Sequence, residues 1–176
     1  NYTPTYALFH GTIGYTVECG ENNEASVTMG KYGLIGHTAY VAENKNGLYL
    51  NQLEFFRRAL NNEESPETEK WFVTQDNQVE ENFREKDEYG KFYPEYYVIP
   101  TDAASQRDIA DAYFMQEYFI CNGVQVEKLT QDVTVNGVTY KAGAFVIDMH
   151  QISRSFANAV LYKGKIVKNW TGLFSE

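Results

Sequence analysis

The sequence contains few cysteines and prolines and has no long apolar run. Of its 176 residues, two are Cys and four are Pro. Cys19 and Cys121 are too few for a disulfide framework and have no metal-binding spacing, so they leave the cellular compartment open. No stretch approaches the roughly 18 apolar residues of a membrane span. The sequence therefore predicts a chain without a membrane span.

Basic charge is also scarce, because 24 acidic residues face 15 Lys and Arg, giving a net charge of −9 and a pI near 4.9. Nucleic-acid phosphates need a basic surface, so we expect no nucleic-acid partner. The hydrophobic content of 43% is that of a globular protein. The sequence starts at Asn1 and shows no signal-peptide pattern, so we expect a processed chain or a part of a longer protein.

Motifs that hold metals or phosphates are absent. No glycine-rich phosphate loop and no Asp-x-Asp-x-Asp-Gly calcium loop occurs. The three histidines are His10, His37 and His150, and none has a Glu three residues further on. We therefore predict no metal ligands in this chain.

Residues 1–62 predict a strand followed by a long helix. In "GTIGYTVECGENNEASV", the segment Ile13–Val17 has the apolar character of a strand, and Asn22 or Asn23 is expected to cap the helix. Glu18 falls where the strand ends. Catalytic carboxylates are often held at such a strand end, so Glu18 is the candidate catalytic residue. The alternative interpretation is a solvated side chain at a strand end.

Residues 63–95 predict an acidic connector. The segment holds eleven Asp or Glu against four Lys or Arg, and its apolar residues come in pairs without a long period. A solvated acidic surface with short strands is the expected structure.

Residues 96–176 predict a small α/β domain in which a mostly parallel sheet is flanked by helices. An apolar helical period begins near Ile109 and ends at Asn122-Gly123, and Thr101, Asp102 or Ser105 is expected to cap this helix. A βαβ unit of this length predicts parallel strands. Asn136-Gly137 predicts a hairpin. The expected strands are Tyr96–Ile99, Val124–Leu129 and Ala144–Ile147. A final helix is expected through Ile152, Phe156 and Val160.

The block "GTIGYTVECGENNEASV…YGLIGHTAYVAENKNGLYLNQLEFFRRALNNEES" resembles the end of the catalytic domain of M14-family zinc carboxypeptidases, in particular large bacterial members. The block from "YYVIPTDAASQRDIADAYFMQEYF" to "AGAFVIDM" is similar to the C-terminal extension of those proteins. The resemblance implies a truncated carboxypeptidase domain, followed by a flavodoxin-like or class I amidotransferase-like module. It also implies a bacterial protein, either cytoplasmic or secreted.

The resemblance places Glu18 at the position of the carboxylate that takes a proton from the zinc-bound water and passes it to the leaving amine. His10 and Thr16 are expected to line the substrate cleft, although His10 is also interpreted as a surface histidine. The family's zinc ligands, a His-x-x-Glu pair and a later His, precede this Glu and are missing here. We therefore expect zinc and a peptide substrate in the intact parent protein, and an inactive, zinc-free isolated chain.

Three alternatives stay open for residues 96–176. The first is a non-catalytic, flavodoxin-like module that binds a small molecule beside Pro100-Thr101-Asp102 and Asp148-Met149-His150-Gln151. The second is an amidotransferase-like hydrolase that uses Cys121 as its nucleophile. The competing interpretation of Cys121 is a buried, unreactive thiol at a helix end. The third is a domain that positions a partner or substrate for the peptidase.

Overall fold

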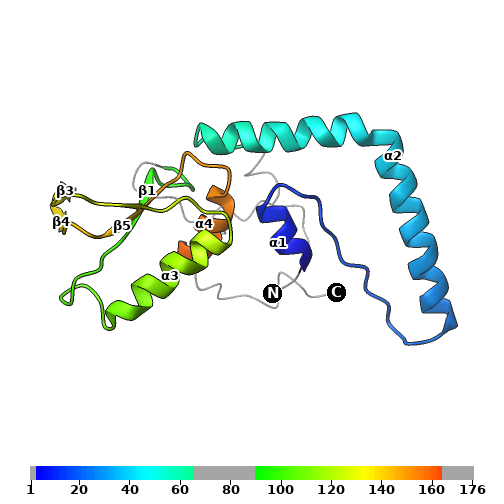
Figure 1. The fold of residues 1–176 in the computed structure, drawn as a ribbon. Helices are drawn as coiled ribbons and strands as arrows, with labels where there is room; N and C mark the ends of the chain where they lie inside the picture. The colour runs from blue at the N-terminus through cyan, green and yellow to red at the C-terminus, as the bar shows by residue number, and fades with distance from the viewer. Residues whose placement is uncertain (1–2, 66–89, 164–176) are drawn as a thin grey trace. The chain divides into compact units, whose positions relative to one another are not determined.

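The computed structural model describes residues 3–65 and 90–163, and the chain divides into two compact units, Asn1–Arg57 and Arg58–Glu176 (Figure 1). The mixed α/β class is confirmed. Among the described helices, none is both long and apolar enough to cross a membrane. The predicted boundaries after residues 62 and 95 stay predictions, and most of the predicted connector, residues 66–89, lies outside the described residues.

The first unit consists of a short helix, an irregular segment and most of a long helix. Helix α1 spans Thr3–Phe9, and α2 spans Glu24–Leu60. Asn23 caps α2, because its Oδ1 accepts a hydrogen bond of 3.0 Å from the amide of Ser26. The sequence therefore predicted the long helix and its N-terminus correctly, whereas it gave no sign of α1.

The predicted strand Ile13–Val17 is not formed within the described residues. The segment from Thr12 to Cys19 is irregular, because none of the described strands lies beside it to offer the hydrogen bonds that a strand needs. It instead lies along α2. Gln52 Nε2 donates to the carbonyl of Gly11 at 3.0 Å, and the Cys19 thiol contacts the carbonyl of Ser26 at 3.8 Å. The segment therefore runs antiparallel to α2.

The second unit combines two helices with two small sheets. Its helices are α3 (Ile109–Cys121) and α4 (Arg154–Leu161). Its strands are β1 (Tyr96–Ile99), β2 (Glu127–Lys128), β3 (Val133–Val135), β4 (Val138–Tyr140) and β5 (Phe145–Asp148). Figure 1 shows the β3–β4 hairpin projecting away from α3 and α4.

The main sheet has the strand order β1-β5-β2, and both of its pairings are antiparallel. The predicted mostly parallel sheet is therefore not what the described strands form. The three strands do share one sheet, and β1 and β2 run in the same direction, as the βαβ spacing predicts. However, the hairpin reverses the chain before β5, and β5 then inserts between β1 and β2.

Local turn signals in the second unit are confirmed, with one correction. Gly123 has a φ of +78°, as expected for the residue that ends α3, and Asn136 and Gly137 have φ values of +50° and +78°, as expected for a two-residue hairpin turn. The cap of α3 is Asp108, whose Oδ1 accepts from the amide of Ala110 at 2.9 Å. The predicted cap residue Asp102 instead closes a separate turn.

The core of the second unit lies between one face of the main sheet and the helices α3 and α4. Phe119, Ile147 and Met149 are its largest fully enclosed side chains. Tyr113 of α3 packs edge-on against Phe145 of β5, with ring centroids 5.2 Å apart. Since side chains alternate along a strand, the opposite face of the sheet carries the side chains of Tyr96, Val98 and Val146, and it faces away from this core.

Candidate functional site

Glu18 lies on the irregular segment before α2, and its side chain is exposed. Within the described residues it has no hydrogen bond and no ion pair. Glu18 is five positions ahead of Asn23, the residue that caps α2, so it does not serve as the cap. The carboxylate is accessible to solvent.

His10 and Thr16 do not join Glu18 in one site. His10 lies just after α1, where its Nδ1 is 2.9 Å from the carbonyl oxygen of Tyr6 and its ring lies against the Tyr6 ring at 4.4 Å. Thr16 is exposed on the irregular segment. His10 precedes the Gly11 contact with Gln52, whereas Glu18 precedes the Cys19 contact with Ser26. The two side chains are therefore near opposite ends of the same stretch of α2.

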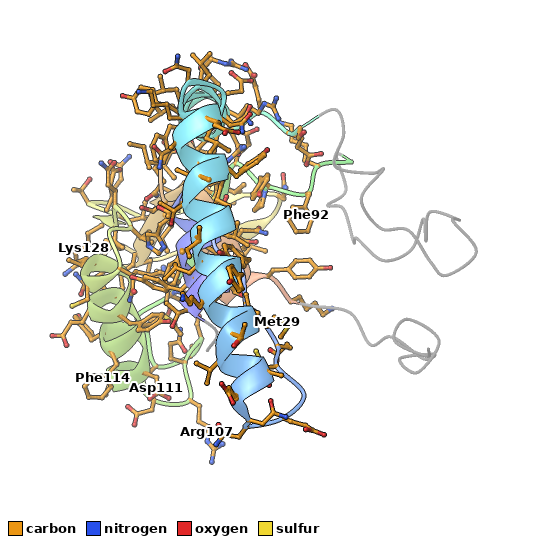
Figure 2. All side chains as sticks on the ribbon, turned by 90° about the vertical axis from the view of Figure 1, so that its right-hand side faces the viewer. Met29, Phe92, Arg107, Asp111, Phe114 and Lys128 are labelled. Atoms are coloured by element: carbon orange, nitrogen blue, oxygen red, sulfur yellow. The ribbon has the colours of Figure 1, made fainter. Side chains whose placement is uncertain are left out.

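The first unit exposes many of its apolar side chains. None of residues 3–57 is buried. On the irregular segment, Ile13, Tyr15 and Val17 expose 58%, 45% and 47% of their surface. Figure 2 shows side chains projecting on every side of α2, Met29 among them. A groove of about 590 Å³ lies between the irregular segment and α2, and its lining includes the apolar and aromatic residues Leu8, Ile13, Tyr40, Val41, Leu48, Tyr49 and Phe55.

The described residues do not assemble a metal site. No group of three His, Cys, Asp or Glu side chains in residues 3–65 and 90–163 is placed to hold an ion. His37 packs against Tyr15 with ring centroids 4.3 Å apart. His150 is held by carboxylates, since its Nδ1 lies 2.8 Å from Asp148 Oδ1 and its Nε2 lies 3.6 Å from Glu95 Oε2.

Thr101 and Asp148, which were predicted to flank one small-molecule crevice, lie towards opposite ends of the β1–β5 pair. Asp148 pairs with Tyr96 at one end of the main sheet, whereas Thr101 follows Ile99, which pairs with Phe145 at the other end. Parallel strands would bring these loops to the same edge, and the antiparallel pairing separates them. Asp102 is used structurally: its hydrogen bonds, that from the Ser105 hydroxyl first, hold its pKa below the usual value.

Cys121 is exposed, so the interpretation as a buried thiol is wrong. Its position at the end of α3 is as predicted. No described histidine or carboxylate is hydrogen-bonded to its sulfur, so the arrangement offers no base that would activate a nucleophile.

Sequence reasoning missed a groove in the second unit. It has a volume of about 900 Å³ and lies between the β3–β4 hairpin and the face of the main sheet opposite α3 and α4. Val98 and Val146 line it from the sheet, and Val133, Val135 and Tyr140 line it from the hairpin. The alternating valines give some sign of two apolar strand faces, but nothing in the sequence indicates that these faces meet across an open space.

Sequence reasoning also missed Arg154, a buried cation at the start of α4 with 5% of its surface exposed. Its Nη2 donates to the carbonyl of Glu63, and its guanidinium lies 4.2 Å from the centre of the Tyr93 ring. Burial lowers the pKa of this guanidinium below its usual value. These contacts make Arg154 a structural anchor rather than an accessible binding group.

In comparisons with known proteins, no protein-family model, no curated protein and no solved structure matches this chain.

Proposed function

We propose that residues 1–62 are the closing segment and helix of an M14-family zinc carboxypeptidase domain, whose remaining parts lie outside this chain. In this proposal the intact protein removes C-terminal residues from peptides, and Glu18 is the group that accepts a proton from water and returns it to the leaving amine. The isolated chain is inactive, because it holds one group of a larger site.

The observation that carries this proposal is the absence of any buried residue between positions 3 and 57. Burial of apolar surface is the main driving force of folding, and this unit exposes the residues that would supply it. The alternating apolar residues Ile13, Tyr15 and Val17 fit one face of a strand. Pairing with a neighbouring strand of a larger sheet would satisfy this segment's main chain and bring Glu18 to a strand end.

The described residues do not fit a zinc ion, because they contain no group of three suitable ligands. What this chain supplies is the carboxylate of Glu18 and the apolar surfaces that fix its position.

The test is a carboxypeptidase assay on the intact parent protein, with an N-blocked dipeptide as substrate. Glu18→Gln keeps the size of the side chain and removes its basicity, so turnover should fall by the ~10²–10⁴-fold typical of a lost general base. Glu21→Gln is the matched control, because Glu21 is an exposed glutamate on the same loop. Full activity of a folded Glu18→Gln protein would contradict the assignment of Glu18.

A second function is proposed for residues 96–176, namely a non-catalytic binding or interaction module. The groove of about 900 Å³ favours it, because its volume is in the range of ligand-binding clefts and its lining is mostly apolar. The antiparallel sheet means that this role does not depend on a flavodoxin-like topology.

A further inference from the structure

Within residues 3–65 and 90–163, strand β1 has main-chain groups without a hydrogen-bond partner beside the groove of the second unit. The amide of Met149 donates to the carbonyl of Glu95 at 3.0 Å, so these two residues form a hydrogen-bonded pair across β1 and β5. In an antiparallel ladder such pairs alternate with non-bonded pairs. The register places Tyr97 in the next bonded pair, so the N–H and C=O groups of Tyr96 and Val98 point away from β5.

These outward groups have no partner among the described residues, because β1 is an edge strand in the order β1-β5-β2. Tyr96, Tyr97 and Val98 all line the groove. The Tyr97 hydroxyl, however, donates to Asn158 of α4 at 2.8 Å, on the helix-covered face. The Tyr97 hydroxyl therefore lies on the face opposite the groove, and the groove extends along residues Tyr96, Tyr97 and Val98 of β1.

The two edges of the sheet differ in chemistry. Edge strand β2 consists of Glu127 and Lys128, and such charges protect an edge from pairing (Lys128 is labelled in Figure 2). Edge strand β1 has the sequence YYVI and carries no charge. Pro94 and Pro100 flank it, and since proline donates no main-chain hydrogen bond, the edge available for pairing is confined to these four residues.

We propose that the β1 edge and its groove bind an extended peptide segment, which adds a strand to the sheet beside Tyr96 and Val98. The peptide's main chain pairs with the outward groups of these two residues, and its alternate apolar side chains enter the groove beside Val133, Val135 and Val146. This inference rests on the second proposed role, that of a binding module, and is independent of the peptidase.

The experiment titrates the 176-residue chain into a fluorescent, acetylated and amidated peptide, Lys-Thr-Val-Thr-Val-Thr-Lys, and records anisotropy and amide hydrogen exchange by NMR. We expect saturable binding and slower exchange of the Tyr96 and Val98 amides. The same peptide with alternate N-methylated amides keeps its side chains but loses main-chain donors, so it should bind about tenfold more weakly or worse.

Val98→Lys, which places a charge on the strand edge, should also weaken binding about tenfold. Ile152→Lys is the matched control, because it adds the same charge at an exposed apolar residue outside the groove lining, and it should bind like the unmodified chain. Equal affinity for the N-methylated peptide overturns strand pairing but leaves the binding module standing. Absence of saturable binding overturns the inference. The inference is also overturned if the Tyr96 and Val98 amides are already protected from exchange in the free chain. Protection that depends on concentration would indicate that a second copy pairs with the edge, and protection that does not would indicate pairing by another segment of the same chain.

Discussion

Arg154 Nη1 donates a hydrogen bond of 2.9 Å to Asn62 Oδ1, joining the first residue of α4 to the segment just after α2, 92 positions earlier in the sequence. Asn62 is itself buried, and its Nδ2 donates to the carbonyl of Pro94 at 3.1 Å. Its φ of +48° is the left-handed conformation in which a helix commonly ends. The last turn of α2 is thereby held within the second unit.

Replacing this buried cation should destabilise the second unit. Arg154→Met keeps the length and the apolar stem of the side chain, but it removes the guanidinium that donates to Asn62 Oδ1 and to the Glu63 carbonyl. We therefore expect the free energy of unfolding to fall by about 2–4 kcal/mol. Urea unfolding measures this change. Arg57→Met is the control: Arg57 pairs with Glu54 at an exposed position, and its loss should cost at most about 1 kcal/mol. Equal effects of the two substitutions would show that Arg154 is no anchor.

Ionisation of the Tyr97 hydroxyl should make the second unit less stable in alkaline solution. Burial, and secondarily the charge of Tyr162, raise the pKa of Tyr97 to about 12 in the folded chain, against ~10 for an unfolded tyrosine. The folded state therefore holds this proton more tightly. The resulting stability is fully present below pH ~10 and is lost as the pH rises towards 12.

Tyr97→Phe should flatten the decline between pH ~10 and 12, measured by urea unfolding at several pH values. At neutral pH the same change should cost about 1–2 kcal/mol, because the buried Asn158 Oδ1 loses its donor. Tyr96→Phe removes an exposed tyrosine from the same strand and is the control. If both variants retain the full alkaline decline, the buried hydroxyl of Tyr97 is not its source.

Glu18→Gln should leave the stability of the isolated chain nearly unchanged. The side chain is exposed and has no partner in the described part of the chain, so the free energy of unfolding should change by no more than ~0.5 kcal/mol. Chemical denaturation of the 176-residue chain measures it. A large loss of stability would mean that Glu18 serves the fold, and the catalytic proposal would lose its basis.

The isolated chain should hold no stoichiometric zinc after dialysis. His10, His37 and His150 lack paired ligand spacing in the sequence, and each contacts other groups in the structure. Elemental analysis of the purified chain measures the zinc content. One tightly bound zinc per chain would contradict both this expectation and the view that the ligands lie elsewhere in the parent protein.

Short-range features of the fold were predictable from the sequence, because their causes lie within a few residues. Strand β1 has the predicted bounds Tyr96–Ile99, and the Asn136-Gly137 turn was found from its dipeptide alone. Strand β5 is shifted by one residue from the predicted Ala144–Ile147. The strand predicted at Val124–Leu129 is reduced to Glu127–Lys128, since only these two residues find partners on β5.

Long-range features could not be predicted, because they depend on which segments meet. The insertion of β5 between β1 and β2 follows from the reversal of the chain at the hairpin, and spacing alone favoured a parallel pair. The burial of Arg154 depends on Asn62 and Glu63, far away in the sequence. For the candidate site, the position of Asn23 relative to Glu18 was predicted correctly, whereas the expected strand before Glu18 needs a partner strand that the described residues do not supply.

The absence of buried residues between positions 3 and 57 has a consequence for the cooperativity of unfolding. The slope of unfolding free energy against denaturant, the m value, scales with the surface that unfolding newly exposes. A first unit that is already exposed adds little to this slope, so the 176-residue chain should unfold with the m value of a clearly smaller protein. If this unit packs against further parts of a larger domain, as proposed above, the slope should rise, and the first unit would then acquire its cooperativity by assembly.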